Sequence, residues 1–189
     1  MNRWPRLHAE GGRSSGRSRG CHLVIVYESE SLGNHHRLDS FDCGKDELNS
    51  WLVDSALHCN RSNTARTFVW VESGGSKAVA YYSLTAHLVE KGTMPSRLGR
   101  GSPEQCPAVL LARLALDKKL QGRGLGGVLL ADALEQVVLA VRNVAARFLV
   151  VDALDGEAVA FYERYGFKRI PGDNRLFRKM SDITASLTT

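Results

Sequence analysis

A glycine-rich stretch in the second half of the chain most constrains the fold. Residues 121–127 read Gln-Gly-Arg-Gly-Leu-Gly-Gly and lie between two largely apolar segments, residues 109–116 and 128–141. This order predicts a strand, a tight loop and a helix. The start of a helix presents unpaired N–H groups and the positive end of its dipole, and glycines let the backbone approach a ligand closely. The stretch therefore predicts a site for a phosphate or pyrophosphate.

Three kinds of glycine loop bind phosphates, and their spacings differ. A P-loop needs Lys-Ser/Thr after its last glycine, and a dinucleotide loop needs Gly-x-Gly-x-x-Gly early in a βαβ unit. This chain has neither spacing at residues 121–127. The third pattern, Gln/Arg-x-x-Gly-x-Gly/Ala, is met by Gln121, Gly124 and Gly126. From these few residues alone, a glycine-rich turn without a ligand stays open.

Length and charge indicate a single folded domain. A chain of 189 residues can form one domain with a sizeable core. We expect it at residues 23–182, after a basic, disordered segment at residues 1–22 and before a tail at residues 183–189. The first segment holds five arginines and one glutamate, so it carries +4 of the net charge of +5. The remainder is about neutral, and overall basicity gives no evidence for a nucleic-acid groove.

The cellular compartment and the metal content are predicted from the absence of a long apolar run and of metal-binding motifs in the sequence. It has no run of roughly 18–20 apolar residues, so we expect a cytoplasmic protein without a membrane partner. The four cysteines show no paired metal spacing and are expected to be reduced thiols. The six histidines form no metal motif either, and His35 and His36 are expected in a solvated turn. We therefore expect no metal.

Hydrophobic periodicity predicts the order of elements. Strands are expected at residues 23–27, 67–72, 78–85, 109–116, 148–154, 167–170 and 175–180, and helices at residues 45–60, 125–143 and 158–165. Residues 28–40 are expected to form a loop, residues 73–76 a hairpin turn and residues 91–107 a long connection. Asp42 is the candidate N-cap of the first helix. The order predicts an α/β or α+β fold, a mixed central sheet with helices on both faces.

The loop, the element order and a second motif together resemble the GCN5-related N-acetyltransferases (GNAT). Residues 161–167, Phe-Tyr-Glu-Arg-Tyr-Gly-Phe, look like the C-terminal Phe-Tyr-x-x-x-Gly-Phe segment of that family. The resemblance covers residues 23–180. It implies the GNAT fold, acetyl-CoA as cosubstrate and transfer of its acetyl group to a primary amine. Asp155 stands where family members often carry an asparagine before this last helix.

One branch of the family is more similar than the rest. Phe41-Asp42-Cys43-Gly44, followed by Leu48, Asn49 and Leu52, resembles the opening helix of toxin acetyltransferases, as do residues 112–117 leading into the loop. These toxins acetylate the α-amino group of aminoacyl-tRNA, block translation and pair with a ribbon-helix-helix antitoxin. A homodimer would join two RNA-binding grooves, although the sequence does not demonstrate one. Two alternatives remain: a housekeeping acetyltransferase for a small amine or protein, and an acyl-CoA-binding module without catalysis.

The resemblance also implies roles for individual residues. Tyr162 is the expected general acid for the leaving thiolate, and Tyr165 is expected to be structural. The backbone of residues 114–116 would pair with the pantetheine arm, and Gln121 and Arg123 would assist the loop at the pyrophosphate. The expected cofactor-binding residues are Leu114, Ala115, Leu116, Gln121, Gly122, Arg123, Gly124, Leu125, Gly126 and Gly127.

We find no general base, which mildly favours an α-amine as substrate. The pKa of an α-amine is near 8, and the ester in aminoacyl-tRNA should lower it further, so such an amine is substantially neutral. Phosphate contacts would need cationic side chains around the cleft. Five residues are candidates for these contacts, each also compatible with an ordinary solvated surface: Arg66, Lys91, Arg97, Arg100 and Arg113.

Overall fold

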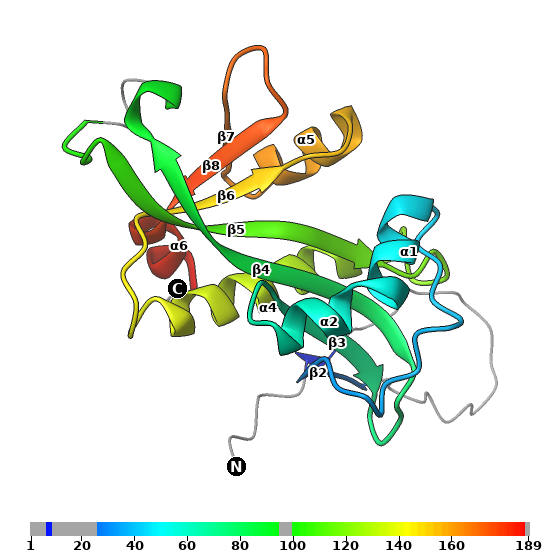
Figure 1. Ribbon diagram of the computed structural model, residues 1–189. Helices are drawn as coiled ribbons and strands as arrows, with labels where there is room; N and C mark the ends of the chain where they lie inside the picture. Colours follow the sequence, from blue (N-terminus) through cyan, green and yellow to red (C-terminus); the bar gives the residue numbers. More distant parts are fainter. Residues whose placement is uncertain (1–6, 9–25, 95–99, 188–189) are drawn as a thin grey trace. The chain divides into compact units, whose positions relative to one another are not determined.

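The structure is a computed structural model that describes residues 7–8, 26–94 and 100–187 (Figure 1). Its elements, in chain order, are β1 Leu7–His8, β2 Val26–Ser31, α1 Asp46–Asp54, α2 Ala56–Arg61, β3 Arg66–Glu72, β4 Ala78–Glu90, η1 Lys91–Thr93, β5 Gln105–Leu116, α4 Leu125–Ala140, β6 Phe148–Asp152, α5 Gly156–Arg164, β7 Lys168–Arg169, β8 Arg175–Lys179 and α6 Met180–Leu187.

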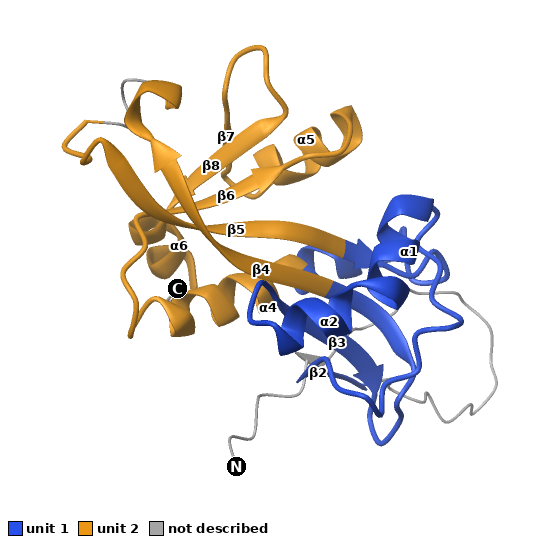
Figure 2. Cartoon of the chain, in the orientation of Figure 1, with its two compact units in different colours: residues 1–81, 115–129 blue, residues 82–114, 130–189 orange. Residues whose placement is uncertain are grey.

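The strands of the described residues form one mixed sheet in the order β1-β2-β3-β4-β5-β6-β8-β7. β5 and β6 are parallel, whereas β2 pairs antiparallel with β3, and β8 with both β6 and β7. The predicted α+β class with a mixed sheet is therefore confirmed. No helix in the described ranges combines the length and the apolar composition that a membrane crossing requires. The chain divides into two compact units (Figure 2).

The first unit comprises residues 1–81 and 115–129. β2 and β3 pair in a register that sets Tyr27 opposite Glu72 and Ser31 opposite Phe68. The core of the unit gathers buried side chains from several elements: Leu32, Phe41, Cys43, Leu48, Leu52, Ala56, Val69, Val71, Ala78, Tyr81 and Ala115. Tyr81 organises the α1 side of this core, because its hydroxyl donates to the Leu48 carbonyl at 2.8 Å and its ring stacks on Trp51.

The second unit comprises residues 82–114 and 130–189. Four consecutive residues of β6, Phe148 to Val151, are fully buried. This agrees with the continuous apolar run, which is typical of a buried parallel strand. β6 lies between β5 and β8, with Ala108 opposite Phe148 and Phe148 opposite Lys179. Asp152 and Arg175 close the far end of the β6–β8 pair through two hydrogen bonds of 2.6 and 2.7 Å.

The structure corrects several predicted boundaries in the first half of the chain. The strand expected at residues 23–27 corresponds to β2, Val26–Ser31, so residues 28–31 are not loop; these polar residues are strand because they pair with β3. Residues 23–25 lie outside the described residues. The expected single helix at residues 45–60 is two helices that meet at Ser55, whose φ of −121° is not helical. β4 continues to Glu90, beyond the predicted end at residue 85. Residues 95–99 of the expected long connection lie outside the described residues.

Two terminal predictions also differ from the structure. In the segment expected to be disordered, Leu7–His8 pairs antiparallel with β2, Leu7 opposite Tyr27. At the other end, residues 180–187 form α6 and not a strand end followed by a tail. Met180 and Ile183 are buried and lie three residues apart, a helical spacing that the surrounding Ser and Thr residues hide in the sequence.

Candidate active site

The glycine loop begins α4 as predicted and presents an open backbone. Gly122 and Gly124 have φ values of 73° and 77°, a backbone conformation that residues other than glycine adopt only with strain. A Cβ at Gly124 would meet no atom within 4 Å, so this face of the loop is accessible. α4 starts directly afterwards at Leu125 and runs for 16 residues. The N–H groups at the start of α4 and the positive end of its dipole therefore favour an anion at this loop.

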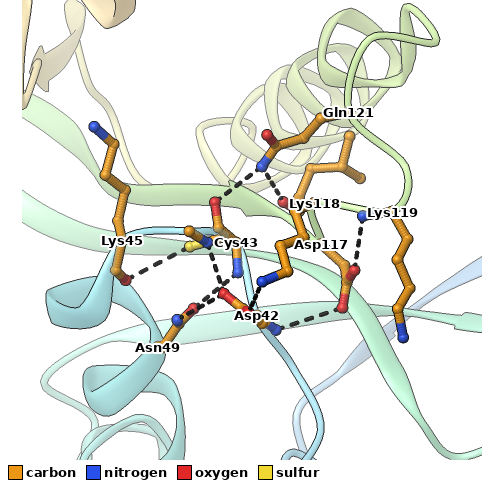
Figure 3. A network of polar contacts seen from close by, with 10 residues as sticks. Asp42, Cys43, Lys45, Asn49, Asp117, Lys118, Lys119 and Gln121 are labelled. Carbon is orange, nitrogen blue, oxygen red and sulfur yellow. Dashed lines mark hydrogen bonds and ion pairs between the residues drawn. The ribbon is translucent and has the colours of Figure 1, made fainter.

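Gln121 has a structural role that the sequence did not indicate. Its side-chain Nε2 donates to the Cys43 carbonyl at 3.0 Å and to the Leu116 carbonyl at 2.9 Å (Figure 3). A primary amide has two N–H donors, and these two contacts use both. Gln121 therefore links the loop to the segment around Cys43 and to the end of β5, and these contacts engage both of its amide N–H groups.

Asp117 holds the start of the same loop. Its Oδ1 accepts from the Lys119 N–H at 3.0 Å and its Oδ2 from the Asp42 N–H at 3.4 Å, and the residue is buried. The Asp117 N–H donates to the Val79 carbonyl at 2.9 Å, which continues the backbone pairing with β4. The sequence does not indicate this role of Asp117, because a contact between residues 42 and 117 has no local signal.

Asp42 completes this connection from the other side. Its carboxylate pairs with Lys118 and accepts from the Gly44 N–H at 2.8 Å and the Asn49 side chain at 3.2 Å (Figure 3). The hydrogen bond from Lys118, followed by that from Gly44, lowers the pKa of Asp42 below its usual value. The prediction that Asp42 is the N-cap of α1 is therefore wrong. Lys45 occupies that position, without a side-chain hydrogen bond.

Residues 41–44 thus form a turn that is held against the start of the glycine loop. Gly44 has a φ of 81°, and the Cys43 N–H donates to Asn49 Oδ1 at 2.9 Å. Phe41 is buried against Tyr81, with ring centroids 5.4 Å apart. We call residues 41–44 and 117–121, together with Asn49, the loop brace. The toxin-like motif and the glycine loop, predicted as separate features, meet in it.

β5 offers a second ligand-binding feature. The parallel register of β5 with β6 runs from Ala108 opposite Phe148 to Leu111 opposite Val151. β5 itself continues to Leu116, so its last residues extend past this register. Leu114 is half-buried, whereas Ala115 and Leu116 are buried. An extended backbone of this kind can pair with a ligand arm through N–H and C=O groups, as strands pair with peptides.

Tyr162, in the second unit, lies on α5 among aromatic rings. Its ring contacts Phe161 and Phe167 edge-on, with centroids 5.2 and 5.4 Å away. Burial raises the pKa of Tyr162 well above its ordinary value, so the hydroxyl keeps its proton throughout the physiological range. Asp155 caps α5, accepting from the Ala158 N–H at 2.9 Å. Tyr165 is the C-cap residue of α5, the structural role expected for it.

The candidate phosphate-binding cations come from different segments of the chain. Arg66 donates to the Asn60 carbonyl at 3.1 Å and to Asn63 Oδ1 at 2.5 Å, so it supports its own turn. Lys91 and Arg100 are exposed and Arg113 is half-buried, whereas Arg97 lies outside the described residues. In the loop, Arg123 is exposed, and its charge partly offsets the burial and the Glu72 charge that raise the pKa of Tyr27.

Comparison with known proteins identifies the family. The model of the Acetyltransferase (GNAT) domain family matches residues 99–185. The tRNA-acetylating toxin of Mycobacterium tuberculosis is 38% identical over 134 residues, which cover 71% of this chain and 80% of that protein.

Solved structures agree with the sequence match. AtaT complexed with acetyl-methionyl-tRNAfMet is 29% identical, with a TM-score of 0.78 over 86% of this chain and 99% of AtaT. A mutant AtaT bound to the C-terminus of the antitoxin AtaR and to acetyl-CoA is 29% identical, with a TM-score of 0.74 over the same shares. On this identity and coverage, the chain belongs to the GNAT acetyltransferases, in the branch of tRNA-acetylating toxins.

Proposed function

We propose that this chain is the toxin of a toxin–antitoxin pair that transfers the acetyl group of acetyl-CoA to the α-amino group of aminoacyl-tRNA. The observation that carries the proposal is the likeness to the tRNA-acetylating toxin, at 38% identity over 80% of that protein. An aminoacyl-tRNA acetylated on its amine cannot attack a peptidyl ester, so translation stops. The substrate places the protein in the cytoplasm.

The cofactor site lies along the end of β5 and the glycine loop. The pyrophosphate binds the N–H groups of the loop and of the first turn of α4, next to Gly122 and Gly124. The pantetheine arm pairs with the backbone of residues 114–116. Arg123 adds a positive charge from the exposed side of the loop. Gln121 contributes indirectly, through the hydrogen bonds that fix the loop brace.

The reaction needs one proton delivered to sulfur. The neutral α-amine attacks the thioester carbonyl, the tetrahedral intermediate collapses, and the carbon–sulfur bond breaks. Tyr162 gives its hydroxyl proton to the departing thiolate and regains a proton from solvent; its raised pKa keeps the hydroxyl protonated before the transfer. The proton released by the amine passes to solvent, so no dedicated base is required for an amine with a pKa near 8.

The partners follow from the same branch. An AtaT structure contains the C-terminus of the antitoxin AtaR, and we propose a comparable antitoxin, of the ribbon-helix-helix class, for this chain. We also propose a homodimer whose two tRNA-binding surfaces join. Size-exclusion chromatography with light scattering tests the dimer.

The decisive experiment offers the protein acetyl-CoA and a pool of charged tRNAs. After nuclease digestion, N-acetyl-aminoacyl-adenosine is measured by mass spectrometry for each amino acid. We expect one or a few isoacceptors to be acetylated. If none is acetylated while a polyamine or a protein N-terminus is, the chain is a housekeeping acetyltransferase. If acetyl-CoA binds but no amine is acetylated, it is a binding module.

A further inference from the structure

Two histidines and a glutamate form a cluster in the first unit, away from the glycine loop in sequence. Glu30 lies on β2, and His35 and His36 lie in the turn that follows. The Glu30 Oε2 atom is 3.3 Å from His35 Nε2 and 3.2 Å from His36 Nε2. One potential ligand atom of each residue lies within 4.8 Å of the other two. The sequence spacing of five and six residues matches no metal motif, so only the fold reveals the cluster.

The two distances from the Glu30 carboxylate are those of hydrogen bonds to the imidazoles, and they also match the spacing of ligand atoms around a metal ion. Four donors about 2.0–2.1 Å from a tetrahedral zinc ion are separated by about 3.3 Å. We propose that Glu30, His35 and His36 bind a divalent transition-metal ion, of which Zn²⁺ fits best, with water as the fourth ligand. Two imidazoles and one carboxylate suit zinc, whereas Ca²⁺ and Mg²⁺ prefer oxygen donors alone.

The surroundings of the cluster support metal binding. The His36 side chain is fully buried, and its Nδ1 lies 3.2 Å from the Gly33 carbonyl. The Gly33 N–H also donates to Nδ1, at 2.9 Å, so both backbone groups of Gly33 hold this ring. With Nε2 on a metal, Nδ1–H would donate to the carbonyl instead, the second-shell bond typical of ligating histidines. The His35 ring lies over the His36 ring, with centroids 3.9 Å apart. Gly33 makes room for it, since a Cβ there would lie 3.0 Å from His35 Nδ1.

The metal would join β2 to the turn that leads into the loop brace. Next to His36, the Arg37 N–H donates to the Ser76 carbonyl at 2.8 Å, and the Arg37 carbonyl accepts from Ala78 at 3.0 Å. The bound ion would therefore fix residues 30–37 between β2 and the start of β4. This role is structural and does not depend on acetyl transfer.

The test measures Zn²⁺ binding to the full chain by isothermal titration calorimetry, together with the melting temperature. Glu30→Gln and His35→Ala each remove one ligand from an exposed or half-exposed position, and His58→Ala is the matched control, because His58 is exposed on α2. We expect one zinc ion per chain and a higher melting temperature in wild type and His58→Ala. Both ligand variants should bind more than about tenfold more weakly.

Cobalt gives an independent readout of the ligands. Co²⁺ bound at this site should show the visible absorption of a tetrahedral ion without a thiolate charge-transfer band, since no cysteine is a ligand. The proposal is overturned if wild type binds no zinc, if Glu30→Gln and His35→Ala bind it as tightly as wild type, or if the cobalt spectrum shows thiolate ligation. None of these outcomes bears on acetylation, which the tRNA assay measures separately.

Discussion

Tyr162 combines a buried hydroxyl with a position in the motif shared with the acetyltransferases, and it defines the first prediction at the scale of single residues. Tyr162→Phe removes the proton donor and keeps the ring that packs between Phe161 and Phe167. We expect turnover to fall by about 100- to 10,000-fold, the usual worth of general acid catalysis, with acetyl-CoA affinity nearly unchanged. Tyr165→Phe, one helical turn away, is the control. Wild-type turnover in Tyr162→Phe would assign the proton to another donor.

The raised pKa of Tyr162 predicts the alkaline side of the pH profile. Burial disfavours the phenolate, so the hydroxyl stays protonated above pH 10, where an exposed tyrosine loses its proton. With a hydrolysis-resistant aminoacyl-tRNA analogue, single-turnover rates should rise as the amine loses its proton at about pH 8, then stay level to about pH 10. A fall in rate between about pH 9 and 10 would indicate an exposed acid with an ordinary pKa.

Substitutions of Gln121 distinguish two roles for its side chain, a structural link between backbone segments and a direct contact with the pyrophosphate. Its two hydrogen bonds to backbone carbonyls are each worth about 0.5–1.5 kcal/mol, so Gln121→Ala should lower the free energy of unfolding by about 1–2 kcal/mol without cofactor. Gln121→Glu should cost more, since it points carboxylate oxygens at two carbonyls. Urea unfolding of the cofactor-free protein measures both. Unchanged stability with weakened acetyl-CoA binding would restore the direct role at the pyrophosphate.

At the scale of elements, a pair of glycine variants can distinguish loss of acetyl-CoA binding at the junction of the glycine loop with α4 from the effect of backbone strain alone. Gly124→Val introduces a side chain at a φ of 77° on the accessible face of the loop. Gly172→Val is the matched control, because Gly172 has a φ of 82° and equally open surroundings in the β7–β8 turn. Both should lose about 1–2 kcal/mol of stability. Only Gly124→Val should weaken acetyl-CoA binding by tenfold or more. Equal affinities in the two variants would show that the glycine loop does not bind the cofactor.

The elements also show what local sequence can and cannot predict. β6, β3 and the loop–α4 junction were predictable, because continuous apolar runs and glycine spacing act over a few residues. β2 was misplaced, since its polar residues become strand only by pairing with β3, some 40 positions later. In the candidate site, the glycine loop and its turn at Gly122 and Gly124 were predicted correctly. The N-cap predicted at Asp42 was wrong, and the contacts of Asp42 and Gln121 were not predicted, because they join residues 75 and 78 positions apart in sequence.

At the scale of the whole molecule, charge is distributed unevenly along the chain. Residues 1–22 hold five arginines against one glutamate, so they carry most of the net charge of +5. An RNA-binding enzyme could use such a segment as a basic arm, or could bind tRNA through the folded domain alone. The two possibilities differ in how tRNA affinity depends on salt, because each phosphate contact releases counterions.

A truncated chain that starts at Cys21 distinguishes tRNA binding by a basic arm from tRNA binding by the folded domain alone. This truncation removes β1, whose only described pairing is two residues against β2, together with a net charge of +4. We expect it to fold with a similar melting temperature and to acetylate tRNA at the wild-type rate, because β2 remains paired with β3 along its length. The slope of log Kd for tRNA against log salt should also be unchanged. Each lost phosphate contact would lower that slope by about 0.7–0.9, so a clear decrease would show that the arginines of residues 1–20 bind tRNA.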